Sequence, residues 1–125
     1  MRIGLALVPF VAMAGTPVLA IGLEDLAKVV LGGQSVLKKA DETCPQSRFS
    51  LTRSDQLALT FARAAAEQAL PISQFQLLDQ ASTADANAEA AKPAFCAETK
   101  KNKTGILSKI KKAGKSLAKA GVLGL

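Results

Sequence analysis

The apolar positions that follow residue 20 recur at the three- and four-residue spacing of a helix. The first expected helix spans residues 23–31, and the Gly32-Gly33 pair predicts its end. Its apolar face is formed by Leu23, Leu26, Ala27 and Val30. A second short helix is expected over residues 35–40, and residues 41–50 are expected to form a loop.

The clearest helical pattern runs from residue 54 to residue 69. Thr52 or Ser54 is suited to cap its start, Asp55 suits the positive end of the helix dipole, and Pro71 follows its end. The polar strip of this helix is narrow and consists of Thr60, Arg63 and Glu67. Because a helix that is apolar around most of its circumference is usually buried by several neighbours, we expect this helix to be the centre of the fold.

Residues 73–80 predict a further short helix, with Phe75, Leu77 and Leu78 as candidate core side chains. Residues 81–92 are rich in Ala, Asp and Asn and predict either a solvated helix or a loop. No run of alternating β-branched residues in the sequence indicates a strand. The pattern therefore predicts an all-α protein, a small helical bundle with three or four helices in its body and one more at its C-terminus.

The stretch from Thr104 to Gly121 separates apolar from polar positions most sharply. At 100° per residue, its apolar side chains fill one arc of the helix and its lysines fill the opposite arc. The apolar side chains that we expect to make contacts are Ile106, Ile110 and Leu117. The lysines opposite them are Lys109, Lys111, Lys112, Lys115 and Lys119. Thr104 is suited to cap this helix and Gly121 to end it.

This C-terminal helix is not expected to be stable in isolation. Gly114 inside it costs about 1 kcal/mol relative to Ala, and lysines three or four residues apart repel one another. The helix needs a surface that accepts its apolar face, either an anionic membrane or the protein's own body. In composition, residues 105–125 resemble the class of cationic helical membrane-active peptides, which implies contact with anionic lipid, although they contain no aromatic anchor.

The first twenty residues have the order of a secretory signal peptide. Arg2 is followed by an uncharged run, and Pro17 precedes small residues at an expected cut after Ala20. A cut after Ala14 and an uncleaved membrane anchor are the alternatives. The predicted organisation is a signal peptide over residues 1–20, a helical body over residues 21–98 and a basic amphipathic tail over residues 99–125.

The chain contains two cysteines, Cys44 and Cys96. An exported protein matures in an oxidising compartment, periplasmic or extracellular, where an even number of cysteines predicts a disulfide. Two free thiols or a metal pair are the alternatives, but two cysteines without a histidine make a poor zinc site. We therefore expect a Cys44–Cys96 disulfide, no metal and no cofactor.

Charge divides the sequence as sharply as hydropathy does. Residues 21–98 carry seven basic and ten acidic side chains, a net −3, whereas residues 99–125 carry eight lysines and no acid, a net +8. A basic tail of this kind is typical of an interaction segment. The chain lacks His, Trp and Tyr, so it has neither the usual general base near neutral pH nor the Trp and Tyr rings on which nucleic-acid bases stack. We expect no enzymatic activity and no nucleic-acid binding, and no small-molecule substrate is indicated.

The sequence therefore predicts an exported, non-enzymatic protein that associates with the cell envelope or with a protein partner. The five lysines of the C-terminal helix would meet an anionic membrane surface, while Ile106, Ile110 and Leu117 insert or dock. The alternative is a small soluble binding module of the inhibitor, immunity-protein or chaperone type, with this helix docked on its own body.

Overall fold

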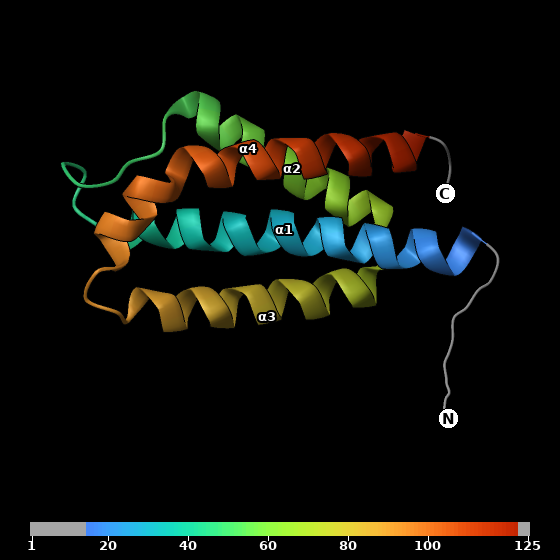
Figure 1. The fold of residues 1–125 in the computed structure, drawn as a ribbon, viewed down its shortest axis with the longest axis horizontal. Coiled ribbons are helices and arrows are strands. Elements are labelled where there is room, and N and C mark those ends of the chain that lie inside the picture. The colour runs from blue at the N-terminus through green and yellow to red at the C-terminus, as the bar shows by residue number, and fades with distance from the viewer. Residues whose placement is uncertain (1–14, 123–125) are drawn as a thin grey trace.

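The computed structural model describes residues 15–122, with side-chain environments for residues 22–120. Four helices follow one another along this part of the chain, namely α1 (Gly15–Thr43), α2 (Arg53–Ala69), α3 (Ile72–Ala90) and α4 (Phe95–Val122). Successive helices reverse direction, α1 lies between α3 and α4, and α2 crosses behind α1 and α4 (Figure 1). No strand occurs among the described residues, and the predicted all-α bundle is confirmed.

The core is built mainly between α1 and α4. The five largest side chains that are fully buried come from these two helices and are Val30, Leu31, Leu37, Ile110 and Leu117. The buried side of α2 consists mostly of alanine, and α3 buries only Phe75 and Ala86. α1 packs extensively on both α3 and α4 and also contacts α2, whereas α3 meets α2 and α4 only slightly, so α1 is the centre of the bundle.

The prediction that residues 54–69 form the central helix is therefore wrong. α2 buries one side only, which is formed by Leu59, Ala62, Ala65 and Ala66. On its outer side, Leu57 is 62% and Phe61 is 56% exposed. The pattern was misleading because alanine favours a helix on a buried face and on a solvated face alike, so the many alanines did not indicate burial.

The Gly32-Gly33 pair does not end the first helix. The two short helices expected over residues 23–31 and 35–40 are one helix, α1, which continues to Thr43. A Cβ added to Gly33 would stand 2.7 Å from Cδ1 of Ile110, so the missing side chain lets α4 pack closely on α1. Glycine disfavours a helix by about 1 kcal/mol relative to Ala, and burying Ile110 offsets that cost.

α3 is a single helix that continues to Ala90. The sequence predicted a shorter helix over residues 73–80 and either a helix or a loop over residues 81–92. The Ala-rich segment continues the helix because alanine has the highest helix propensity and because Ala86 packs into the bundle, only 2% exposed. Phe75 is buried as expected, whereas Leu77, also predicted for the core, is 68% exposed.

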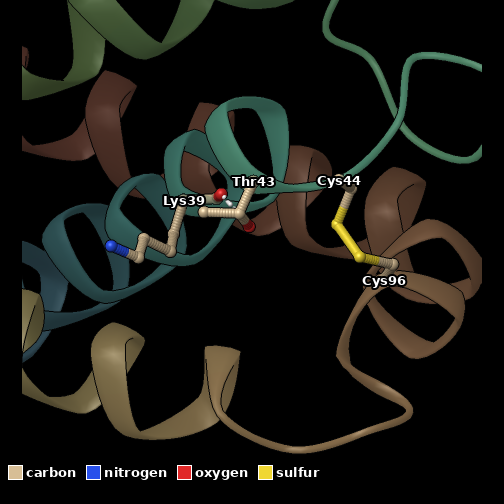
Figure 2. The surroundings of a disulfide bond; sticks show 4 residues. All are labelled: Lys39, Thr43, Cys44 and Cys96. Carbon is tan, nitrogen blue, oxygen red and sulfur yellow. Dashed lines mark hydrogen bonds between the residues drawn. A yellow bond between two sulfur atoms is a disulfide. The ribbon is translucent and has the colours of Figure 1, made fainter.

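The predicted disulfide joins Cys44, directly after α1, to Cys96 in the first turn of α4 (Figure 2). The two Cα atoms are 5.8 Å apart, and the bond links residues 52 apart in sequence. Closing a loop of this length should stabilise the fold by about 4 kcal/mol, mainly by restricting the unfolded chain. Disulfides persist in oxidising compartments, so this bond indicates maturation outside the cytosol. Beside it, the Thr43 hydroxyl donates to the Lys39 carbonyl at 2.7 Å.

The expected signal peptide lies partly outside the described residues, which begin at position 15. A cut after Ala20 would fall inside α1, and a cut after Ala14 would directly precede α1. Ala27 is the first buried side chain within residues 22–120 and lies after both expected cuts, so either cut retains every core side chain found in that range. In the described part of the chain, no helix has both the length and the apolar content needed to span a bilayer.

Candidate functional site

The basic C-terminal segment belongs to a helix that starts earlier than the sequence predicted. α4 begins at Phe95, so Thr104 lies inside it and is exposed rather than acting as its cap. Phe95 is buried, Cys96 is held by the disulfide, and Glu98 lies in the first turn, where the helix dipole favours a carboxylate. The expected boundary between body and tail, between residues 98 and 99, thus falls within one continuous helix.

The apolar face of α4 packs on α1 and α2. Ile110 and Leu117 are completely buried, and Ile106 is half-buried. Where α4 crosses α2, a Cβ added to Gly114 would stand 2.9 Å from the Cβ of Ala62. Of the two surfaces that the sequence left open for this helix, the protein's own body is the one that it contacts in the structure.

The opposite side of α4 is a lysine face, formed by Lys109, Lys111, Lys112, Lys115 and Lys119, all of which are exposed. Among residues 22–120, no carboxylate lies within 4.0 Å of these five ammonium groups. The predicted lysines therefore share one surface, and their charges are available to a partner. Of the two roles expected for Ile106, Ile110 and Leu117, insertion or docking, these side chains dock in the structure and hold α4 on the bundle.

The charge separation along the sequence becomes a charge separation in space. α4 carries eight lysines and the single acid Glu98, whereas α3 carries three acids and no basic residue. These two helices lie on opposite sides of α1 (Figure 1). An anionic surface would attract the α4 side and repel the α3 side, so the charges of these two helices favour one orientation.

Lys103 belongs to α4 but contacts the body of the protein rather than solvent alone. Its ammonium group lies 3.1 Å from the Asp55 carboxylate, donates to the Ser50 carbonyl at 2.8 Å and sits 5.7 Å from the centre of the Phe49 ring. Asp55 also forms a capping box with Thr52 at the start of α2. Burial tends to raise the pKa of Asp55, but hydrogen bonds from Thr52 and Lys103 outweigh it and lower that pKa.

A shallow groove of about 460 Å³ is lined by this ion pair and by three members of the lysine face, Lys111, Lys112 and Lys115. Four ammonium groups and one carboxylate give the groove a net positive charge. Lys109 and Lys119 do not line it. Sequence reasoning missed Asp55 and Lys103 as parts of this surface, because only the packing of α2 beside α4 brings them together.

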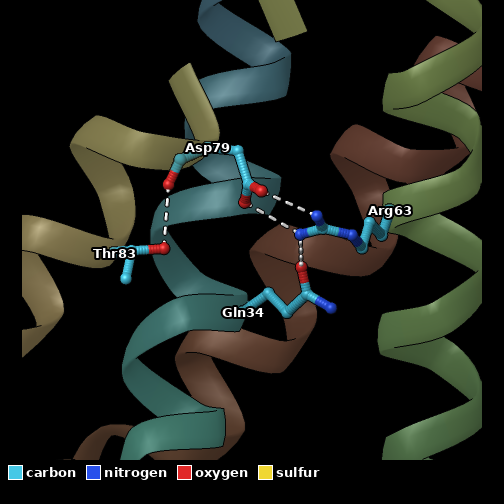
Figure 3. Close-up of polar contacts among 4 residues, drawn as sticks. All are labelled: Gln34, Arg63, Asp79 and Thr83. Atoms are coloured by element: carbon cyan, nitrogen blue, oxygen red, sulfur yellow. Dashed lines mark hydrogen bonds and ion pairs between the residues drawn. The ribbon is translucent and has the colours of Figure 1, made fainter. Parts of the chain in front are cut away.

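A second polar cluster joins α1, α2 and α3. Arg63 donates two hydrogen bonds to Asp79, at 2.9 and 2.8 Å, and one to the Gln34 side-chain oxygen at 3.0 Å (Figure 3). The Arg63 guanidinium also lies 5.2 Å from the centre of the Phe75 ring. The hydrogen bond from Arg63 lowers the pKa of Asp79, although partial burial opposes this. Because the two charges are paired with each other, we assign this cluster a structural role.

In the described part of the chain, no group of three or more Cys, Asp or Glu side chains is arranged to hold a metal ion. Comparison with protein-family models, with curated proteins and with solved structures finds no match.

Proposed function

We propose that this is an exported, non-enzymatic protein that binds an anionic lipid surface of the cell envelope through the lysine face of α4. The observation that carries the proposal is the gathering of five exposed lysines on one side of a packed helix, with no carboxylate of the described residues beside them. The opposite charge of α3, across α1, supports a preferred orientation on such a surface.

Binding by the folded protein is favoured over insertion of a detached α4. Detachment would expose the faces of α1 and α2 that now cover Ile110 and Leu117, and each large apolar side chain left in water costs about 1.5–3 kcal/mol. The lysines gain about 1 kcal/mol each near an anionic leaflet, and they already face solvent. Detachment therefore adds a cost without adding a lysine contact.

The strength of this contact follows from the number of lysines. Five lysines at about 1 kcal/mol each give about 5 kcal/mol. This free energy corresponds to a dissociation constant of about 0.2 mM. The contact is solvent-exposed and should weaken as salt screens the charges. The proposal is thus of reversible, salt-sensitive attachment.

Sedimentation of the disulfide-bonded protein with vesicles tests this directly. One set of vesicles contains equal parts of phosphatidylglycerol and phosphatidylcholine, and the other contains phosphatidylcholine alone. We expect binding to the anionic vesicles that declines as sodium chloride is raised, and little binding to the neutral ones. Failure of the protein to sediment with either kind of vesicle would contradict the proposal.

Two triple variants separate the lysine face from net charge. The test variant carries Lys111→Gln, Lys112→Gln and Lys115→Gln. The control variant carries Lys28→Gln, Lys38→Gln and Lys92→Gln, which are exposed positions outside α4. Both variants lose three positive charges, but only the first should lose most of its vesicle binding. Equal losses would show that overall charge, and not this face, determines binding.

The docking of α4 on the bundle favours a second candidate, the small soluble binding module of the inhibitor, immunity-protein or chaperone type. In that case α4 is a structural helix and its lysines serve solubility. This candidate predicts that the protein does not bind anionic vesicles. It also predicts that the variant with Lys111→Gln, Lys112→Gln and Lys115→Gln binds the same protein partner as the wild type.

A further inference from the structure

Two large apolar side chains on α2 face solvent where burial was expected. Leu57 and Phe61 lie one helical turn apart, so they are neighbours on the helix surface, and they are 62% and 56% exposed. The buried side of α2, which includes Ala62 and Ala66, lies on the other side of the helix axis. An exposed phenylalanine beside an exposed leucine forms an apolar patch on the solvent-facing side of α2.

The contacts of α2 show which side of the molecule this patch is on. Ala62 meets Gly114, and Asp55 pairs with Lys103, so one edge of α2 faces α4. Arg63 bonds to Gln34 and Asp79, so the other edge faces α1 and α3. At 100° per residue, Phe61 falls toward the α4 edge of the exposed side.

The same contacts place the lysines of α4 along this edge. The pairs Asp55–Lys103 and Ala62–Gly114 advance together along the two helices, so α2 and α4 run in the same direction, as Figure 1 shows. Phe61, next to Ala62, therefore lies at the level of Gly114. On α4 that level is flanked by Lys111 and Lys115, which also line the groove that reaches Asp55.

We infer that Leu57 and Phe61 enter the interfacial region of the same anionic lipid surface that the lysine face binds, so that α2 and α4 together form one membrane-docking surface. This inference rests on the proposed function and deepens it. The aromatic residue of α4, Phe95, is buried and cannot meet a lipid surface, whereas Phe61 of α2 is exposed and supplies an aromatic anchor. Rings and aliphatic side chains beside lysines suit the boundary between headgroups and acyl chains.

The charges beside the patch favour contact with a lipid surface over contact with a second copy of the chain. A symmetric dimer through the patch would bring Lys111 and Lys115 of each copy toward those of the other, and the repulsion would oppose association. An anionic lipid surface neutralises these lysines at the place where it accepts Phe61. Lysines alone give weak attachment, and stable attachment to a membrane generally requires a second signal.

Tryptophan fluorescence gives a direct test, because the chain contains no Trp and no Tyr. The test variant is Phe61→Trp, and the control is Leu77→Trp, at a position 68% exposed on α3. With vesicles of phosphatidylglycerol and phosphatidylcholine that carry brominated acyl chains, the indole at position 61 should shift its emission to shorter wavelength and be quenched. The indole at position 77 should remain as in buffer.

A matched pair of leucine variants measures the contribution of the patch. Leu57 and Leu77 are 62% and 68% exposed, so neither Leu57→Ser nor Leu77→Ser removes a core side chain. Leu57→Ser should weaken binding to the anionic vesicles by about tenfold, whereas Leu77→Ser should leave it within about twofold.

The outcomes distinguish this inference from the function on which it rests. Salt-sensitive binding without quenching at position 61, or equal effects of the two leucine variants, would overturn the apolar contact and leave the lysine contact standing. A wild-type protein that binds no anionic vesicle would overturn both. A blue shift of the indole at position 61 that depends on protein concentration in the absence of lipid would show a second copy as the occupant instead.

Discussion

Gly114 of α4 lies against Ala62 of α2 so closely that a Cβ on the glycine would stand 2.9 Å from the Cβ and 3.1 Å from the Cα of the alanine. The second of these atoms belongs to the backbone, which can yield only if the helix moves. The residue that weakens α4 as an isolated helix is therefore the residue that lets α4 pack on α2. This crossing holds the lysine face in place.

Gly114→Ala should lower the free energy of unfolding. Alanine gains about 1 kcal/mol of helix propensity, but overpacking at a close helix crossing costs about 1–3 kcal/mol, so we expect a net loss of about 1 kcal/mol. Gly105→Ala in the same helix is the control, because a Cβ there meets nothing within 4 Å. It should stabilise the protein by up to about 1 kcal/mol. Urea unfolding monitored by circular dichroism measures the free energy of unfolding of both variants. Effects of the same sign would show that Gly114 is not needed for the close crossing of α2 and α4.

Removal of the disulfide should cost a large part of the total stability. Replacing both Cys44 and Cys96 by serine should lower the free energy of unfolding by about 4 kcal/mol, out of the 5–15 kcal/mol that is roughly typical of small domains. A reducing agent should shift the unfolding midpoint of the wild type in the same direction and leave the double variant unchanged. Equal midpoints for the oxidised wild type and the variant would show that the bond contributes nothing.

The start of α2 provides a paired test of capping. Thr52 accepts a hydrogen bond from the Asp55 backbone at 3.0 Å, whereas Ser54 lies inside the helix. Thr52→Ala should therefore destabilise the protein by about 1 kcal/mol, and Ser54→Ala should change its stability by less than about 0.5 kcal/mol. Thermal unfolding of the two variants distinguishes the two candidate caps that the sequence left open.

Acid should weaken the contact between α2 and α3 through Asp79. Because Arg63 lowers the folded-state pKa of this carboxyl, its contribution is present above the unfolded pKa of about 3.9 and is lost as pH falls through the lower folded pKa. The pair is partly exposed, so we expect about 1 kcal/mol or less. Asp79→Asn should flatten the pH dependence of the unfolding free energy below about pH 5. Asp85→Asn, exposed on the same helix, controls for the loss of one negative charge, and an identical pH profile for the two variants would argue against the pair.

Export can be checked by the mass of the protein recovered from the periplasm or medium of an expressing bacterium. We expect a chain that begins at Ile21, with Gly15 as the alternative start. Ala20→Phe should block the first cut and Ala14→Phe the second, because the residue before a signal-peptide cut must be small. Recovery of the full-length chain from the membrane fraction would show an uncleaved anchor.

The sequence was sufficient for the features that depend on local pattern or on composition. Helical periodicity predicted the all-α class, the two cysteines predicted the disulfide, and the 100° spacing placed all five lysines on one face. These succeed because helix faces depend on spacing along one segment, and because two cysteines in an oxidising compartment have one intramolecular pairing available.

The tertiary structure alone decided which helix is central and what the glycines do. Leu57 and Phe61 belong to the helix that periodicity predicted to be buried by several neighbours, yet they face solvent, since burial depends on which neighbouring helix covers a face. The sequence predicted that Gly33 helps to end a helix and that Gly114 destabilises one. In the structure each of these glycines allows a close helix crossing. Lys103 pairs with Asp55, and lysines of α4 lie beside the exposed patch of α2, although these two helices are far apart in sequence. Spacing along one helix carries no information about the face of another, and only packing brings the two together.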